Sequence, residues 1–244
     1  MKWLVYISSL LLVLGCGENR NDDCITSLGN DGSNTRLVDK FTKIYVEDRI
    51  KLLLVQDSAN AGIIELRGPE NLLEQVTTIV EDGELKLKNR NTCNFVRSFN
   101  YELAVKVYFA DLDKLTVESI AEVKSQDTIK IDRLEIYHNA LSDISLSLFG
   151  NEVFVQSKNS AQTTLNGVVR VLKGTIEEIS NLDAYSLRCE EVLLDSHTPL
   201  ACEVNATNGL YIKIYNSGDV LYKDEPSDYK ILEVNTGSGK LKKK

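Results

Sequence analysis

Four acidic side chains in the second half of the chain have types and spacing that could serve catalysis: Asp183, Glu190, Glu191 and Glu203. Paired carboxylates hydrolyse glycosidic bonds, one as the acid and the other as the base or nucleophile. The second half of the chain is built of sequence repeats, described below, and these residues fall on adjacent repeats. There they would line a cleft like that of a polysaccharide lyase or glycoside hydrolase. A row of acids more often keeps a protein surface soluble, and fold analogy alone does not establish function. An enzyme of this kind is therefore the alternative, and a non-catalytic protein the main hypothesis.

Neither the histidines nor the cysteines form a recognisable catalytic or metal site. His138 and His197 each stand in or beside a polar turn, where we expect solvated side chains, and no Ser/His/Asp combination is favoured by spacing. Cys189, His197 and Cys202 lack the closely spaced ligand pairs of a zinc site. The glycines of residues 237–241 lack the length of a phosphate-binding loop. We expect no catalytic residue, no metal and no cofactor.

The first residues have the composition of an export signal. Lys2 precedes an apolar run over residues 3–14, which is shorter than the roughly 20 residues of a membrane-spanning helix, so residues 1–15 are predicted to be a signal peptide. The ending Val-Leu-Gly before Cys16 resembles a bacterial lipobox, which predicts that Cys16 becomes the first mature residue and carries acyl chains such as palmitate. Gly17, in place of an aspartate, favours the outer membrane. An ordinary secretory signal with an incidental cysteine is the alternative.

The other four cysteines divide into two pairs by their surroundings. Cys24 and Cys93 lie in polar, loop-like stretches, and in an oxidising compartment we expect them to form a disulfide. Cys189 and Cys202 lie in apolar strand patterns, which favours two reduced and buried packing residues. Stacked positions on neighbouring turns would also let those two pair.

The charge balance excludes a nucleic-acid partner and favours a lipid anchor. The formal net charge is -8, so a basic nucleic-acid footprint is absent. An acidic chain is also repelled by anionic lipid surfaces, which leaves lipid on Cys16 as the membrane attachment. Residues 16–36 are polar without an apolar period, which predicts a tether. The lysines of residues 240–244 indicate a solvated strand edge or tail.

From Phe41 onward, short runs alternate apolar and polar residues with the period of half-buried β-strands. A short helix competes with a strand only over residues 71–80, where Leu72, Leu73 and Val76 fit one helical face. The following Glu-Asp-Gly at residues 81–83 predicts a hairpin turn.

The second half of the chain repeats itself at nearly regular intervals. Comparable segments recur with a second set of apolar strands between them; the starts are Ile120, Leu141, Ala161, Leu182, Leu200 and Gly218. A period of about 20 residues predicts a parallel β-solenoid, in which each turn buries its inward side chains against its neighbours. We expect inward side chains at Val155, Val171, Leu194 and Ile214. A β-sandwich is the alternative.

Several segments carry a resemblance to a known family: G-P-E-N-L-L-E-Q-V at 68–76, D-G-E-L-K-L at 82–87, S-G-D-V-L-Y-K-D-E-P at 217–226 and G-S-G-K-L at 237–241. They resemble the head GIN domain of auto-transporter adhesins, over residues 37–242. The resemblance implies an all-β, right-handed parallel β-helix with an N-terminal strand-rich section, in an envelope of the Bacteroidota type. It also implies no enzyme activity.

These observations favour a non-catalytic binding module on a lipid anchor in the cell envelope. Its ligand would be a protein or a glycan, and exposed tyrosines could contact either; the candidates are Tyr137, Tyr185, Tyr211 and Tyr215. A structural envelope component that binds a partner lipoprotein is a further alternative.

Overall fold

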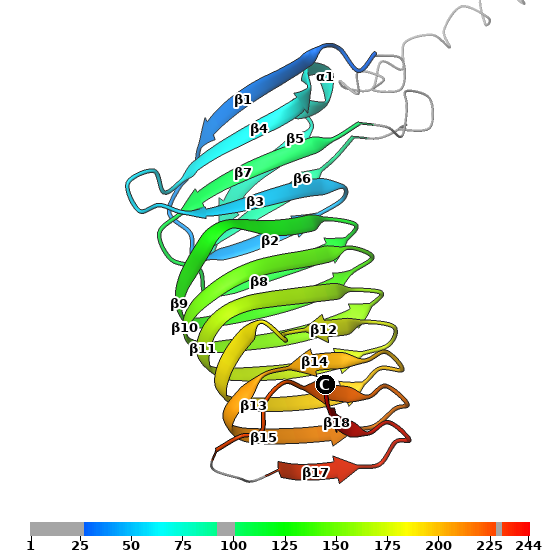
Figure 1. Cartoon of the computed structure of the whole chain (residues 1–244). Helices are drawn as coiled ribbons and strands as arrows, with labels where there is room; N and C mark the ends of the chain where they lie inside the picture. Colours follow the sequence, from blue (N-terminus) through cyan, green and yellow to red (C-terminus); the bar gives the residue numbers. More distant parts are fainter. Residues whose placement is uncertain (1–26, 92–100, 228–230) are drawn as a thin grey trace, which may run out of the picture.

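A computed structural model of the chain describes residues 27–91, 101–227 and 231–244. The protein is all-β, and most of its strands form a parallel solenoid of about six turns, as the repeat predicts. Figure 1 shows strands stacked in two walls, with turns at the right-hand edge and bent strands at the left-hand edge. The β-sandwich alternative is therefore wrong.

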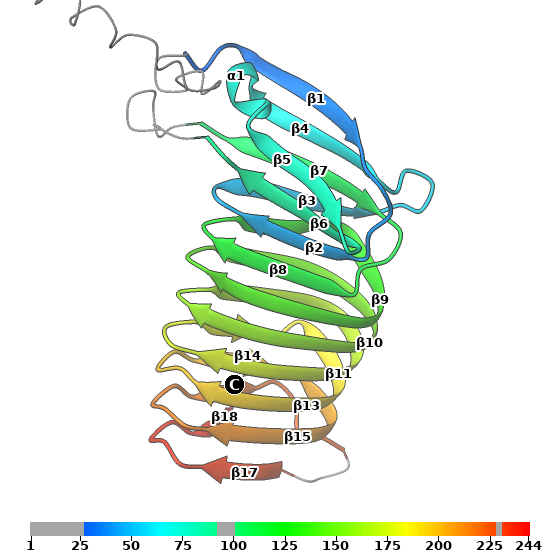
Figure 2. The ribbon, with the colours of Figure 1, turned by 180° about the vertical axis from the view of Figure 1, so that it is seen from behind.

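The two walls share the long bent strands β9 (Glu122–Ala140), β10 (Asp143–Asn159) and β11 (Gln162–Glu177). From top to bottom in Figure 1, the wall that carries their first halves contains β1 (Asp31–Leu37), β4 (Ile63–Pro69), β7 (Leu103–Phe109), β3 (Ile50–Gln56), then β12 (Asn181–Asp183), β14 (Cys202–Val204), β16 (Val220–Tyr222) and β18 (Leu241–Lys243). The other wall, in front in Figure 2, contains β5 (Val76–Glu81), β6 (Glu84–Asn89), β2 (Lys43–Glu47), β8 (Lys114–Ser119), then β13 (Leu187–His197), β15 (Ala206–Ile214) and β17 (Ile231–Asn235).

Columns of aliphatic side chains between the walls form the core. One column joins residues in direct register on successive turns, each fully buried: Leu134, Val153, Leu172, Val192 and Leu210. Parallel pairing places identical positions about 4.8 Å apart, so each side chain packs on those above and below it. The repeat visible in the sequence therefore corresponds to one turn of the coil.

The four residues predicted to face inward are all buried, but one of them, Val171, lies outside the aliphatic column. All four residues predicted to face inward are buried: Val155, Val171, Leu194 and Ile214. Val171, however, lies in register with Glu152 and Glu191, and it is Leu172 that joins the aliphatic column. The strict alternation of inward and outward residues fails here because β11 bends between the walls.

The bends require residues without a side chain at close contacts. In β10 the buried positions are even-numbered from 144 to 148 and odd-numbered from 153 to 157, so the alternation changes phase across the bend. Gly150 has φ 156°, and a Cβ there would lie 1.8 Å from the carbonyl oxygen of Ile131. Glycine therefore lets the backbone of one turn lie against the turn before it.

A cap of four elements, β1, β4, α1 (Glu70–Leu73) and β5, covers the upper end of the coil in Figure 1. Residues 31–36, expected in the polar tether, instead form part of β1, which pairs antiparallel with β4. Over residues 71–80 the helix and the strand hypotheses are each confirmed in part, because α1 ends at Leu73 and β5 begins at Val76. The guanidinium of Arg36 joins these elements: it donates to the Leu73 carbonyl at 2.7 Å and to Thr78 Oγ1 at 3.1 Å.

Two local predictions are confirmed. Asp82 and Gly83 have φ 51° and 72°, the conformation of a two-residue hairpin turn, and they join antiparallel β5 and β6. The C-terminal lysines lie on or beside the edge strand β18, where Lys242 contacts Asp219 at 2.5 Å and Lys244 contacts Glu203 at 2.7 Å. In the described part of the chain, no helix has the length and apolar character needed to cross a bilayer.

Candidate binding groove

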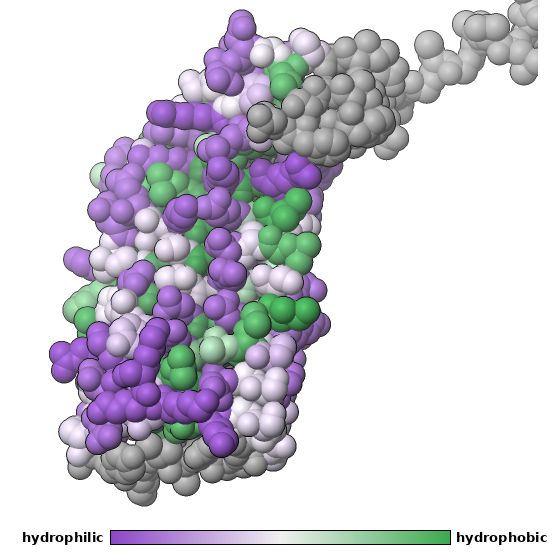
Figure 3. Space-filling model, turned by 45° about the vertical axis from the view of Figure 1, so that its right-hand side comes forward, coloured by the Kyte–Doolittle hydropathy of each residue, from purple (hydrophilic) through white to green (hydrophobic). Residues whose placement is uncertain are grey.

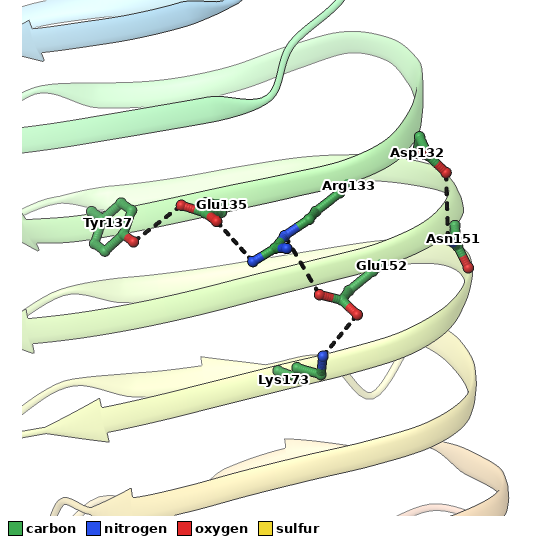
Figure 4. A network of polar contacts seen from close by, with 7 residues as sticks. All are labelled: Asp132, Arg133, Glu135, Tyr137, Asn151, Glu152 and Lys173. Carbon is green, nitrogen blue, oxygen red and sulfur yellow. Dashed lines mark hydrogen bonds and ion pairs between the residues drawn. The ribbon is translucent and has the colours of Figure 1, made fainter.

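A ladder of polar contacts crosses three turns on the outer face, as Figure 4 shows. Arg133 contacts Glu135 at 3.0 Å and Glu152 of the next turn at 3.6 Å, and Lys173 of the turn after that contacts Glu152 at 2.8 Å. Tyr137 completes the row by donating to Glu135 at 3.1 Å. Cation and carboxylate alternate along the ladder, so its charges are satisfied within the protein.

The ladder also changes the titration of its members. The hydrogen bond from Lys173 lowers the pKa of Glu152, while burial and the hydrogen bond to Glu135 raise the pKa of Tyr137. Both shifts keep the groups in the ionisation states that the ladder requires. These side chains therefore link successive turns of the coil, and they leave little unpaired charge for a ligand.

Beside the ladder, a hollow of about 440 Å³ lies along the bends of the strands. One wall is a column of outward side chains in register, Phe149, Val168 and Arg188. Buried Val169 and Cys189, together with Gly150, line its floor, and the opposite side is lined by Arg170, Glu190, Thr207 and Asn208. We call this feature the bend groove.

The bend groove combines apolar surface with unpaired charge. Phe149 is 56% exposed and Val168 47% exposed, although large apolar side chains usually avoid water. Arg188 and Glu190 make no hydrogen bond or ion pair with any residue that the structure describes, whereas Arg170 donates from Nε to Asn151 at 2.6 Å. Exposed apolar surface beside unpaired polar groups is typical of a ligand site.

The four acidic residues proposed for catalysis are divided between separate places. Asp183 and Glu203 are register partners on β12 and β14, and Glu203 also binds Lys244. Glu190 lines the bend groove, while Glu191 lies in register with Val171. The structure therefore brings together one pair, and that pair includes a carboxylate already held by a lysine.

The two histidines have different environments. His138 was expected to be solvated, which is wrong: it is 1% exposed, and its Nδ1 lies 2.9 Å from Thr163 Oγ1, which also bonds Ser157. Burial lowers the pKa of His138 to about 4. His197 is partly exposed and stacks on Tyr215, with ring centroids 4.1 Å apart. Among the described residues, neither histidine is hydrogen-bonded to a carboxylate that could orient it toward a nucleophile.

The tyrosines do not form one platform. Tyr137 belongs to the ladder and packs on Phe154, with their ring centroids 5.9 Å apart. The ring of Tyr185 lies beneath the ammonium groups of Lys223 and Lys244. Tyr211 is half-buried, and Tyr215, on the turn side, is 41% exposed.

The cysteines that the structure describes are packing residues, as predicted. Cys189 and Cys202 are free and buried, and burial raises the pKa of their thiols to about 12 and about 11. Residues 27–91, 101–227 and 231–244 contain no cluster of three or more His, Cys, Asp or Glu able to hold a metal ion. The predicted lipidation site Cys16 and the predicted disulfide partners Cys24 and Cys93 lie outside the described residues.

A row of exposed apolar side chains lies at the turn edge, opposite the bend groove. Its members occupy turns of the coil and are 38% to 63% exposed: Ile120, Leu141, Ile179 and Leu200. Figure 3, turned toward this edge, shows apolar patches following its right-hand side.

Comparison with known proteins identifies the family. A family model described as "Putative auto-transporter adhesin, head GIN domain" matches residues 40–226. The chain belongs to this family. Among curated proteins none matches this chain.

Solved structures show that the GIN solenoid has close relatives in shape. An adhesin described as putative from Bacteroides fragilis has a TM-score of 0.82 at 20% identity, covering 90% of this chain and 100% of its own. A putative lipid binding protein from Parabacteroides distasonis has a TM-score of 0.65 at 18% identity, covering 88% of this chain and 97% of its own. A putative adhesin from Parabacteroides merdae has a TM-score of 0.64 at 15% identity, covering 90% of this chain and 98% of its own. At these identities the comparisons establish the fold.

Sequence reasoning missed Phe149, Val168 and Arg188 as candidate site residues. One signal was available: Phe149 and Gly150 stand where the strand alternation changes phase, so a large aromatic residue faces outward beside a glycine. The register that brings Val168 and Arg188 beside Phe149 follows from the bends and is visible only in the structure.

Proposed function

We propose that this GIN-domain protein is a cell-envelope lipoprotein whose solenoid is a non-catalytic binding module. The observation that carries the binding role is the bend groove, with its exposed Phe149 and with Arg188, which has no partner among the residues that the structure describes. Family membership supports the same role, because the family is described as a "Putative auto-transporter adhesin, head GIN domain". A solenoid held at every turn by backbone pairing is a rigid support for such a surface.

The anchor in this proposal is Cys16, the residue after the signal-like segment 1–15, and the outer membrane is the expected site. Of the expected tether, residues 27–30 pack on the cap, where the Ser27 carbonyl accepts from Asn71 Nδ2 at 2.8 Å and Leu28 contacts the core, so the tether proposed here is residues 17–26. Ten extended residues span at most about 36 Å, so the solenoid can stand away from the bilayer surface. The Cys16→Ser variant should accumulate as unprocessed precursor without lipid. Normal membrane anchoring of that variant would contradict the proposal.

The Cys24–Cys93 disulfide is proposed as a covalent tie between the tether and the polar segment that follows β6. Closing a loop of about 70 residues would stabilise the fold by about 4 kcal/mol in the chain-entropy model. Thiol alkylation under oxidising conditions should label neither cysteine until a reductant is added. Ready labelling of both would exclude the pairing.

The binding role can be tested by comparing two exposed apolar residues. The immobilised full-length protein should retain a component from a panel of surface polysaccharides and envelope extracts, and Phe149→Ala should abolish that retention. Leu141→Ala is the matched control, because Leu141 is similarly exposed but lies at the turn edge. Equal losses in both variants, or none in either, would argue against the bend groove.

A further inference from the structure

We propose that the bend groove binds an acidic glycan, with Phe149 supporting the apolar face of a sugar ring and Arg188 holding a sugar carboxylate. The inference rests on the proposed binding function and assigns its ligand class. It concerns a groove that crosses the turns, so successive units of a linear polymer would meet successive turns of the coil.

The aromatic contact is the first element of the argument. Phe149 is 56% exposed and lies in register with Val168, itself 47% exposed, so the two form one continuous apolar strip on the groove wall. A pyranose ring has an apolar face of C–H groups, which packs on an aromatic ring while its hydroxyls remain solvated. A strip this narrow fits such a face better than the broad apolar surface of a protein partner.

The charged contact is the second. Arg188 continues the same column and has no hydrogen-bond or ion-pair partner among the described residues. A guanidinium binds a carboxylate through two parallel hydrogen bonds, which fixes the position of the ligand as well as its charge. Arg170 adds a second guanidinium, of which only Nε is engaged, by Asn151 at 2.6 Å. The positive groove stands out on a chain of net charge -8.

The remaining lining residues favour a hydroxylated ligand over a simple anion. Glu190, also without a partner in the described part of the chain, is an acceptor-only carboxylate, so it can bind the hydroxyl groups of a sugar, which an inorganic sulfate lacks. Thr207 and Asn208 line the same hollow: the Thr207 hydroxyl donates to the Cys189 carbonyl at 3.0 Å and can still accept, and the Asn208 amide can donate and accept. An acidic sugar offers the carboxylate, the hydroxyls and the apolar face together.

Calorimetric titration of the full-length protein in detergent tests the assignment with defined probes. A galacturonate tetrasaccharide should bind, and a neutral glucose tetrasaccharide should bind at least tenfold more weakly. Arg188→Gln should weaken uronate binding at least tenfold with little effect on the neutral sugar, and Phe149→Ala should weaken both. Arg67→Gln removes another exposed arginine without a partner among the described residues, and it should leave binding unchanged.

Other ligand classes are outcomes of the same experiment. Equal or tighter binding of an acidic tetrapeptide, or of vesicles containing phosphatidylglycerol, would overturn the glycan assignment. Equal affinity of wild type and Arg188→Gln for the uronate would overturn it as well. If no sugar binds while retention of an envelope component still depends on Phe149, the binding function stands and the ligand class is wrong. Thermal unfolding of each variant confirms that the exposed substitutions leave the fold intact.

Discussion

The N-terminal section and the repeats both add turns to one coil, but the chain connects those turns in different orders. From β8 downward each turn follows its predecessor in the chain, and register partners lie one repeat apart in the sequence. In the N-terminal section the turn formed by β2 and β3 lies between the β6–β7 turn above it and the β8–β9 turn below it. The chain thus builds an inner turn first, adds the cap, and then returns to continue the coil.

This difference explains why the sequence predicts one section better than the other. In the repeats a period is visible because sequence neighbours are spatial neighbours. In the N-terminal section Ile44 pairs with Leu85 and with Leu115, which share no fixed interval, so alternation predicts strands without their order. Strand β1 is missed because its residues are mostly polar and exposed, and it is held by backbone pairing and by Arg36.

The candidate site depends on the detail that sequence patterns predict least. Outward positions are easily assigned within a regular strand, but the bend groove lies where alternation changes phase. The same change explains why Val171, although buried as expected, lies outside the aliphatic column, and why Phe149 is absent from the predicted site. Physical contacts at the bends, such as the one that requires Gly150, determine the register there.

The largest effect is expected in the aliphatic column of the repeats. Leu172→Asp places a carboxylate in a fully buried column and should cost about 4 kcal/mol or more in the free energy of unfolding. Arg170→Asp, at an exposed position two residues earlier, should change it by about 0.5 kcal/mol. Val171→Asp should fall between them. Chemical denaturation measures all three, and equal costs for Leu172→Asp and Arg170→Asp would contradict the register.

Acid should loosen the repeats before the cap. The folded pKa of His138, about 4, lies below the ordinary value of 6.5, so the unfolded chain binds a proton first as the pH falls. Stability is therefore complete above pH 6.5 and declines toward pH 4, by about 3 kcal/mol in total. The cap contains no histidine. Hydrogen exchange at pH 5 should show lost protection first in β9 and β10.

The control for this acid effect is His138→Gln, which should lose the dependence between pH 6.5 and 4.5 while retaining a polar side chain near Thr163. A wild-type stability that is flat over that interval would mean that His138 is solvated after all.

The cap should depend on a single arginine. Arg36 donates to two elements of the cap, at Leu73 and Thr78, and burial lowers its pKa. Arg36→Gln leaves the carbonyl of Leu73 without this charged donor, so we expect a loss of about 2 kcal/mol. Hydrogen exchange should report the loss in β1 and β5, with β13 and β15 unchanged. Uniform loss over the whole coil would show that cap and repeats unfold as one unit.

The smallest effect is expected for the ladder of the repeats. Arg133 is 64% exposed, so Arg133→Gln should cost less than about 1 kcal/mol, in contrast to Arg36→Gln in the cap. Lys173 supplies the largest contribution that lowers the pKa of Glu152, and Arg133 a smaller one. Nuclear magnetic resonance titration should therefore find that Lys173→Gln raises the pKa of Glu152 more than Arg133→Gln does. The reverse order would mean that the ladder is held from the turn above, and that Arg133 links the turns as Arg36 links the cap.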